Sequence, residues 1–327
     1  MRAAPAVSVV IVTYESGPML QRCLDALKAQ RFTDFETILS DNGSADRAAQ
    51  AAAAADPSLI LVENGANLGF SAGNNRAALK ARGRWLALLN PDAFPEPDWL
   101  QRLVAKAEGG DAVTAWTSLQ IADDDGRLLD GAGDAMTIMG LPYRMGYRRA
   151  RPAALEDGEV FSPCGAAMLI DRQTYLALGR LDERFFCYCE DADLGWRLRL
   201  AGGRTRLAAD AVVRHVGSAT SGARSDFTVY HGARNRLWCW AKNAPPVLFA
   251  LGTPMHLLAG GLFSLLAGKA GRRGFRDGLK RFREFRRERP AGGSADIARA
   301  MTWNPWKAAT RGLDVRRDPE PRPSAIR

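Results

Sequence analysis

The sequence has few of the residues from which disulfide frameworks and zinc sites are built. It contains five cysteines and three histidines in 327 residues. An odd number of cysteines in a chain of this length argues against a disulfide framework. Cys187 and Cys189 stand close together, but no second pair lies near them, whereas structural zinc ligands come in paired spacings. We therefore expect free thiols, mostly buried.

The sequence also lacks the two glycine-rich loops that most often hold nucleotide phosphates. A run of β-branched residues at 7–13 is typical of a strand buried on both faces, and Tyr14, Glu15 and Ser16 follow it. Neither G-x-G-x-x-G nor G-x-x-x-x-G-K-S/T occurs at that point, so neither a dinucleotide-binding fold nor a P-loop is supported. A nucleotide bound by this chain must therefore be held by other residues.

The composition excludes global disorder and a polytopic membrane protein, since 46% of the residues are hydrophobic and 25% are charged. The N-terminal apolar run is too short for a signal peptide, so we expect a cytoplasmic protein. The net charge of +9 is largely local, because residues 269–289 hold ten Lys/Arg against three Asp/Glu. Such a block indicates an anionic surface as partner. Nucleic acid is not expected, because the acidic clusters elsewhere would repel phosphates.

The N-terminal third alternates strand and helix patterns. Strands are expected at 7–13, 35–39, 59–62 and 85–89, and helices at 19–28, 48–55 and 74–81. Helical connections of this length imply right-handed crossovers and a parallel sheet with helices on both faces. The predicted fold class is therefore α/β, with a mostly parallel central sheet and further helices near the C-terminus.

Polar clusters follow all four expected strands, at residues 13–15, 41–44, 63–67 and 90–92. Because ligands of parallel sheets bind at the carboxyl ends of the strands, the clusters predict a single site. Asp41 would accept hydrogen bonds from a base or ribose, or would simply close its own turn, and both interpretations stay open. Asp92 offers the hard oxygen ligand that Mg²⁺ or Mn²⁺ prefers.

A stretch with regularly placed glycines, residues 67–75, precedes the third expected helix. Its backbone N–H groups and the helix N-terminus would face a diphosphate. A plain capped helix start is the alternative.

A second cluster combines acidic and aromatic residues at 181–199. Glu190, Asp191 and Asp193 lie within four positions at the start of an expected helix. Crowded carboxylates repel one another unless they bind cations, cap a helix or transfer protons. The structural alternative is stabilisation by the helix dipole alone. His215, just after a strand pattern, is the histidine best suited to be a ligand.

Taken in order, these motifs resemble glycosyltransferase family 2, the inverting enzymes with the GT-A (nucleotide-diphospho-sugar transferase) fold. The resemblance extends from about residue 7 to about residue 243. Its motifs lie at 10–14, 41–46, 67–75, 90–92, 165–168, 185–194 and 215–217. Bacterial members that resemble this chain build rhamnose-containing or other cell-envelope glycans.

The resemblance implies a role for each matching residue. Asp191 corresponds to the catalytic base, with Glu190 beside it. Asp92 corresponds to the last acid of the D-x-D motif for Mg²⁺ or Mn²⁺, and His215 completes the metal or diphosphate site. The residues expected to contact the donor are Thr13, Tyr14, Glu15, Asp41, Asn67, Gly69, Gly73, Asn74 and Asn90. The pair Arg234-Asn235 also matches the family, without an assigned role.

The resemblance further implies transfer of a sugar from a UDP- or dTDP-linked donor to a hydroxyl of a glycan or lipid-linked glycan. Residues 1–110 would form the donor half of the domain and residues 111–225 the acceptor and catalytic half. Two other functions are weighed against it. A noncatalytic nucleotide-sugar- or glycan-binding protein would lack the base, and a sugar nucleotidyltransferase would carry a glycine-rich, lysine-bearing loop after the first strand.

The C-terminal part, residues 226–290, is expected to be helical and to associate with a membrane. Residues 247–268 are almost uncharged over a bilayer-crossing length, although Pro254, His256 and four glycines interrupt them. Phe275, Leu279 and Phe282 recur at helical spacing among arginines, as in an interfacial amphipathic helix. We expect peripheral attachment to the inner face of the cytoplasmic membrane, with core packing of residues 247–266 as the alternative. Residues 291–327 are expected to form a loosely ordered tail.

Overall fold

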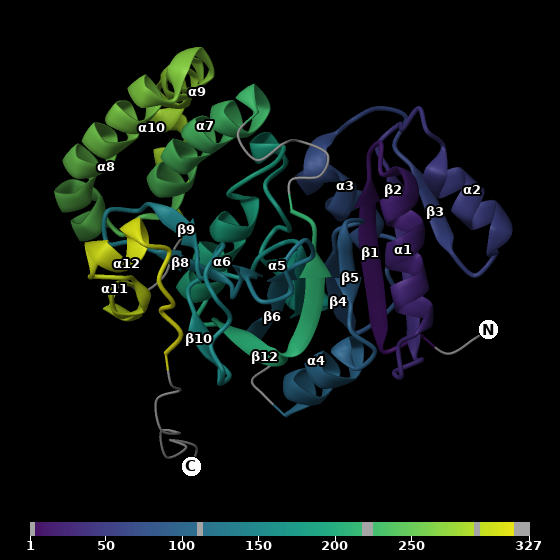
Figure 1. The fold of residues 1–327 in the computed structure, drawn as a ribbon. Coiled ribbons are helices and arrows are strands. Elements are labelled where there is room, and N and C mark those ends of the chain that lie inside the picture. Colours follow the sequence, from purple (N-terminus) through teal and green to yellow (C-terminus); the bar gives the residue numbers. More distant parts are fainter. Residues whose placement is uncertain (1–3, 110–113, 218–224, 291–294, 317–327) are drawn as a thin grey trace.

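The computed structural model describes residues 4–109, 114–217, 225–290 and 295–316 (Figure 1). Its centre is a sheet of ten strands, eight of which follow one another in the order β10-β12-β6-β11-β4-β1-β2-β3. β5 pairs with β12, and β7 pairs with β6. β3, β2, β1 and β4 are parallel, and β11 joins them to β6 with antiparallel pairing on both sides. The predicted α/β class with a mostly parallel sheet is confirmed.

The N-terminal third follows the predicted alternation closely. Its elements are β1 (Val7–Thr13), α1 (Gly17–Lys28), β2 (Phe35–Asp41), α2 (Ala48–Ala55), β3 (Ile60–Glu63), α3 (Gly69–Ala78) and β4 (Trp85–Leu89). Only α3 differs by more than two residues at its start, because it begins at Gly69 and not at residue 74. The stretch with regularly placed glycines is therefore mostly the first turns of a helix.

The middle of the chain extends the same sheet and adds a small hairpin. Its elements are β5 (Ala93–Pro95), α4 (Trp99–Glu108), β6 (Thr114–Ala122), β7 (Leu129–Gly131), β8 (Asp134–Met136), β9 (Pro142–Arg144), β10 (Gly158–Val160), β11 (Ala167–Asp171), α5 (Arg172–Ala177), the 3₁₀ turn η1 (Glu183–Phe185), α6 (Glu190–Leu200) and β12 (Arg204–His215). β8 and β9 pair with each other outside the main sheet. β12 runs parallel to β6, so its carboxyl end brings His215 beside residue 122.

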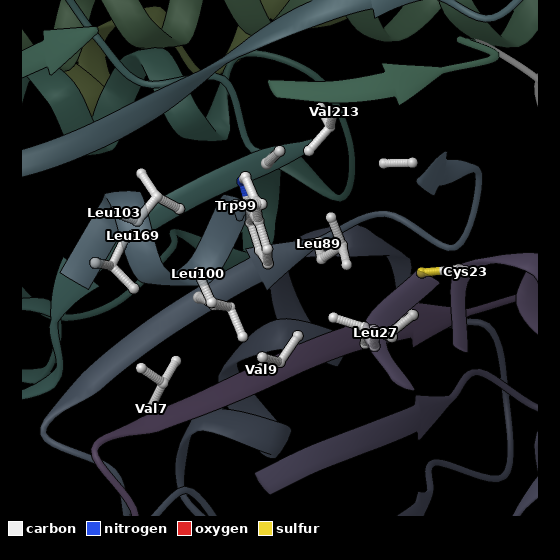
Figure 2. Close-up of a cluster of buried hydrophobic side chains, with 14 of the residues drawn as sticks. Val7, Val9, Cys23, Leu27, Leu89, Trp99, Leu100, Leu103, Leu169 and Val213 are labelled. Carbon is white, nitrogen blue, oxygen red and sulfur yellow. The ribbon is translucent and has the colours of Figure 1, made fainter. Parts of the chain in front are cut away.

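Helices cover both faces of the sheet, as expected. Figure 2 shows one face, where Val7 and Val9 of β1 lie near Leu27 of α1 and Trp99 and Leu100 of α4. The other face is covered by apolar side chains of α3, α5 and α6. Burial on both faces explains the continuous apolar runs of β1 and β4.

Four helices follow the sheet: α7 (Asp226–Asn243), α8 (Pro246–Leu266), α9 (Gly268–Lys280) and α10 (Phe282–Arg287). They lie together on the opposite side of the molecule from α1 and α2 (Figure 1). α9 packs on α7 through buried glycines; a Cβ atom at Gly274 would lie 2.3 Å from the carbonyl oxygen of Tyr230. Phe275 lies against α8 at Gly260, and Phe282 stacks on Phe249. The apolar face predicted for an interfacial α9 is therefore largely turned inward.

The exposed apolar surface belongs to α8 instead. Among the described residues α8 is the one helix long and apolar enough to cross a membrane, and 11% of its most apolar stretch is buried. The alternative interpretation, in which this segment packs in the core, is therefore wrong, since only His256 and Ser264 are buried in it. The large exposed side chains of α8 are Val247, Leu251, Met255, Leu258, Leu262, Phe263, Leu265 and Leu266.

The predicted loose tail is wrong for residues 295–316, while 291–294 and 317–327 lie outside the described residues. This segment forms α11 (Ala295–Ala300) and α12 (Pro305–Ala309) and returns to the β8–β9 hairpin. The backbone of Thr302 donates to Met136, and that of Arg316 pairs with Glu159. Ile297 and Met301 are buried. The composition suggested disorder. The segment is instead stabilised by burial of these two apolar side chains and by backbone hydrogen bonds to the rest of the chain.

Candidate active site

A hollow of about 220 Å³ lies at the carboxyl ends of β1, β4 and β12. This is the edge at which parallel sheets bind ligands. Of the predicted site residues it is lined by Tyr14, Asn67, Gly69, Asn90, Asp92 and His215. We call it the donor hollow. Residues that sequence reasoning did not assign complete it, notably Arg144, Phe186 and Tyr188.

Asp92 and His215 meet because β5 pairs antiparallel with the end of β12. The backbone of Val216 donates to the carbonyl oxygen of Asp92, and the His215 Nε2 atom lies 3.2 Å from Asp92 Oδ1. The Asn90 amide nitrogen is 3.5 Å from the same Nε2 atom. The sequence placed these three residues at one site, and the structure brings them together.

A second carboxylate, Asp130, lies on the far side of the His215 ring. His215 Nδ1 lies 2.8 Å from Asp130 Oδ2, and Arg144 forms an ion pair with the same oxygen at 3.0 Å. Burial acts to lower the pKa of His215, but its hydrogen bonds to Asp130 and Asp92 prevail and raise the pKa to about 9. Without a metal, His215 is therefore an imidazolium at neutral pH. Asp130 stands in a short strand with no recognisable motif, which is why the sequence did not reveal it.

The residues at this point fit a divalent cation. Asp92 would supply a carboxylate oxygen, and His215 would supply Nε2 once it had lost its proton. Asp130 would then fix the ring through Nδ1–H, the usual carboxylate partner of a metal-bound histidine. The described residues hold no group of three or more His, Cys, Asp or Glu side chains placed around one ion. Magnesium sites commonly take their remaining ligands from water and substrate phosphates.

Asp191 lies at a second hollow, of about 170 Å³, which we call the acceptor hollow. Arg144 and Tyr188 line both hollows, so the two adjoin. Asp191 lies in the first turn of α6, and its Oδ2 atom accepts a hydrogen bond from the backbone N–H of Gly165 at 3.1 Å. Its side chain is half-buried, which suits a group that must contact a substrate and exchange a proton with it.

Glu190, predicted beside Asp191 as a catalytic residue, lines neither hollow. Its side chain is buried, and its Oε2 atom has no hydrogen-bond partner among the described residues. Burial, with the charge of Asp191 next to it, raises the pKa of Glu190 well above the usual range. Because Glu190 is buried away from both hollows, the structure does not support its assignment as a catalytic residue, and that assignment is corrected.

The loop before Asp191 has an unusual backbone. Phe186, Tyr188 and Cys189 all adopt positive φ angles, between 67° and 72°. Such conformations are costly for non-glycine residues and persist only when their surroundings enforce them. Here the enforcing residue is Asn235 of α7, whose fully buried amide nitrogen lies 2.7–2.9 Å from the carbonyl oxygens of residues 185, 187 and 188.

Arg234 supports the same loop, since its guanidinium donates to the carbonyl oxygen of Phe185 at 2.9 Å. The Arg234-Asn235 pair, which the sequence left without a role, therefore holds the loop that presents Asp191.

Three of the predicted donor residues lie behind the donor hollow. Asp41 is buried, and its carboxylate accepts hydrogen bonds from the Thr13 and Ser44 hydroxyls, from the Gln50 amide and from two backbone N–H groups. Glu15 accepts from the backbone of residue 45. Asp41, Thr13 and Glu15 thus tie the loops after β1 and β2 together. The turn-closing interpretation of Asp41 holds in this structure.

Two further donor predictions are corrected by the early start of α3. Asn74 is buried inside the helix and donates to the carbonyl oxygen of Phe70. Gly73 packs on β1, where an added Cβ would lie 2.7 Å from Val12 Cγ1. Gly69, in contrast, has φ of +81° and contacts Phe186 closely, because an added Cβ would lie 2.5 Å from its carbonyl oxygen. Gly69 therefore joins the donor side to the loop that carries Asp191.

Comparisons with known proteins agree with this geometry. The family model described as Glycosyl transferase family 2 matches residues 8–176. N-acetylglucosaminyl-diphospho-decaprenol L-rhamnosyltransferase of Mycobacterium tuberculosis is 32% identical over 233 residues, which cover 63% of this chain and 75% of that protein.

Solved structures show the same fold at low sequence identity. GalNAc-T7, solved with UDP, GalNAc and Mn²⁺, superposes with a TM-score of 0.60 at 17% identity. The match covers 95% of this chain and 58% of GalNAc-T7. The mannosyltransferase PcManGT of Pyrobaculum calidifontis, in complex with GDP-Man and Mn²⁺, gives 0.56 at 18% identity and covers 88% and 84% of the two chains.

Proposed function

This chain belongs to glycosyltransferase family 2, and we propose that it transfers a sugar, with inversion, from a nucleoside-diphosphate donor to a hydroxyl group. One observation carries the proposal: the hollow that holds Asp92 and His215 adjoins the hollow that holds Asp191. Arg144 and Tyr188 line both of them. A donor diphosphate in the first would thus face an acceptor hydroxyl in the second.

In the proposed reaction Asp191 accepts the proton of the acceptor hydroxyl as that oxygen attacks the anomeric carbon. A well-placed general base contributes about 100- to 10,000-fold to the rate. The backbone N–H groups of Gly165 and Ala192 fix the Asp191 carboxylate, which lines the acceptor hollow. Attack opposite the leaving group inverts the anomeric carbon in one displacement.

Asp92 and His215 would hold Mg²⁺ or Mn²⁺ on the donor diphosphate. The cation, when bound, offsets the negative charge that builds up on the leaving nucleoside diphosphate. Asp130 keeps the His215 ring in position, and Arg144 balances the charge of Asp130. Tyr14, exposed at the end of β1, would border the base of the nucleotide.

We propose the substrates of this chain by analogy with the mycobacterial relative. The mycobacterial relative is a rhamnosyltransferase with a lipid-diphosphate acceptor in its name. By analogy, the donor of this chain would be a dTDP- or UDP-linked deoxyhexose or hexose. Rhamnose is the first candidate for the transferred sugar. The acceptor would be a lipid-linked cell-envelope glycan.

A lipid-linked acceptor requires the enzyme to work at a membrane. Leu251, Leu258 and Leu266 of α8 are 75%, 65% and 81% exposed, and Trp303 and Trp306 near α12 are 64% and 73% exposed. Exposed leucines and tryptophans are typical of a membrane-binding face.

Basic residues of the neighbouring α9 add electrostatic attraction to anionic lipid. The side chains of Arg273 and Arg276 are 71% and 70% exposed, and each such charge contributes about 1 kcal/mol at an anionic surface. We propose peripheral attachment to the inner face of the cytoplasmic membrane through α8.

The test is incubation of the full-length protein with a panel of nucleotide sugars, Mg²⁺ or Mn²⁺, and an extract of bacterial lipid-linked glycans. Mass spectrometry then scores the nucleoside diphosphate released and the mass gained by the acceptor. We expect one donor to be consumed with gain of one sugar mass, and EDTA to stop the reaction. Release of nucleoside monophosphate, or no release with any donor, would contradict the proposal.

A further inference from the structure

The acceptor hollow contains a second carboxyl group that base catalysis does not use. Asp134, the first residue of β8, lines this hollow together with Asp191. Carboxyl groups crowded into one site repel each other, and burial with the nearby charge of Asp191 raises the pKa of Asp134. Because the hollow, at about 170 Å³, has room for little more than a sugar ring, a sugar bound there would lie next to both acids.

Asp134 is almost enclosed, and one of its oxygens lacks a hydrogen-bond partner. The residue is 9% exposed, and no described residue donates a hydrogen bond to its Oδ1 atom. Arg144, which lies opposite Asp134 in the β8–β9 pairing, forms its ion pair with Asp130. Buried polar atoms without a partner are rare in proteins. A substrate hydroxyl in the hollow would supply a donor for this carboxyl group.

The position of Asp134 is fixed through its backbone. Its N–H donates to the carbonyl oxygen of Ser162, and its own carbonyl oxygen accepts from the N–H groups of Phe161 and Ser162, all at 3.1 Å. Gly133, just before it, has φ of +80°, and an added Cβ would lie 2.9 Å from Thr117 Cγ2. A glycine is therefore favoured at this turn of the chain. A carboxyl group held on a paired strand keeps the fixed geometry that recognition of one particular hydroxyl needs.

The rest of the lining suits a small ring with polar substituents. Pro142, Tyr143 and Tyr188 contribute apolar and aromatic surface to the hollow. Ligand sites commonly combine such surface with a few placed polar groups that fix the orientation of the ligand. Asp134 and Asp191 are two such groups, on different elements, so each would meet a different hydroxyl of the same ring.

We propose that Asp134 binds a second hydroxyl of the acceptor sugar, on the same ring as the hydroxyl that Asp191 deprotonates. The inference rests on the proposed glycosyl transfer, and it names the substrate class of the acceptor hollow: a sugar ring with at least two free hydroxyl groups. A simple alcohol, which offers only the reacting hydroxyl, would be a poor acceptor. Asp134 is thus a specificity-determining residue, and Asp191 remains the base.

The first experiment measures transfer to the octyl pyranosides of glucose, galactose, mannose and N-acetylglucosamine. For the best acceptor, each hydroxyl group is then replaced by hydrogen in turn. In the wild type, loss of one hydroxyl other than the reacting one should lower kcat/KM about tenfold, as for loss of a hydrogen bond to a charged group. In Asp134→Ala, the parent and this deoxy analogue should react within about twofold of each other, with an unchanged KM for the donor.

Two further variants serve as controls. Asp134→Asn keeps the shape of the side chain and one accepting oxygen, so it should fold normally and retain part of the preference. Asp125→Ala should keep all of it, because Asp125 lines neither hollow and pairs with Arg127. The same preference in wild type and Asp134→Ala would overturn the inference, since Asp134 would then face an enclosed water molecule only.

A second experiment measures binding without turnover. The same octyl glycosides and their deoxy analogues are titrated into the full-length protein with UDP and Mn²⁺, with saturation-transfer NMR as the readout. Parent and analogue share the octyl chain, so its binding to apolar surface cancels in the comparison. The wild type should bind the parent about tenfold more tightly than one deoxy analogue, and Asp134→Ala should bind both equally. Equal affinities in the wild type would overturn the inference even if sugar transfer were observed. A preference that depends on Asp134, without transfer by the wild type, would instead contradict the proposed function.

Discussion

The side-chain amide of Asn235 lies 2.7 Å from the carbonyl oxygen of Tyr188, and this contact ties α7 to the loop that presents Asp191. The sequence identifies Asn235 as part of a family motif but cannot say what it touches, because 47 residues separate the two partners. In the structure it stabilises three residues with positive φ in the loop before the base.

Replacing Asn235 with Ala should therefore lower kcat and leave donor affinity unchanged. Without the amide the loop loses the hydrogen bonds that hold its strained backbone, at a cost of about 1–3 kcal/mol in stability. Steady-state kinetics and nucleoside diphosphate binding separate the two effects. Gln30→Ala is a matched control, because Gln30 is a buried amide that also makes three hydrogen bonds, far from both hollows. If both variants reduced kcat equally, Asn235 would have only a structural role.

The affinity for a divalent cation should increase with pH. His215 has a pKa of about 9 without metal, so binding a cation at Nε2 releases a proton. With excess nucleoside diphosphate present, the affinity for Mn²⁺ measured by titration calorimetry should rise by about tenfold from pH 7.5 to 8.5. His215→Gln should remove this dependence. The same affinity at both pH values in the wild type would argue against His215 as a ligand.

Asp134→Asn should stabilise the protein more at pH 8 than at pH 5. Burial and the nearby charge of Asp191 raise the pKa of Asp134 to about 7. In the unfolded chain this group ionises near pH 4, so the folded state binds the extra proton between pH 4 and 7, and stability falls as the pH rises through that window.

Urea denaturation at the two pH values measures this difference. We expect the variant to gain about 2 kcal/mol relative to wild type on going from pH 5 to pH 8. An identical difference at both pH values would show that Asp134 ionises normally.

Membrane attachment should depend on the exposed leucines of α8. The double variant Leu251→Ser/Leu258→Ser should bind anionic vesicles at least about tenfold more weakly, because each leucine in lipid contributes about 1.5–3 kcal/mol. Leu79→Ser is the control, since Leu79 is a 63% exposed leucine at the end of α3 and not part of α8. Cosedimentation with vesicles gives the affinities. Unchanged binding by the double variant would exclude α8 as the attachment surface.

Local patterns in the sequence were enough to predict the first four strands of the sheet and half of the site. β1, α2 and β4 coincide with their predicted ranges because each has a local signal: a β-branched run in β1, repeated alanines in α2 and a short apolar run in β4. Asp92 and His215 meet as expected because each follows a strand of the same sheet. The predicted start of α3 was wrong because the glycines suggested a loop. Gly69 is instead the first residue of the helix, and tertiary packing stabilises the turns that follow it.

Long-range contacts account for what the sequence did not reveal. Asp130 becomes important only because β7 places it beside His215, 85 positions away. Asp41 and Glu190 look like functional carboxylates in any local reading, yet the fold turns both inward. Residues 295–316 read as disordered by composition, and their order depends on the backbone of the β8–β9 hairpin. None of these features has a local signal.

The central claim is that Asp191 removes the proton of an acceptor whose donor is held separately by Asp92 and His215. The most direct measurement compares sugar transfer and donor binding in wild type and in Asp191→Asn, which keeps the shape of the side chain and removes its basicity. Transfer should fall by about 100- to 10,000-fold while the dissociation constant of the nucleoside diphosphate with Mn²⁺ stays within about twofold. Full turnover by Asp191→Asn would contradict the account.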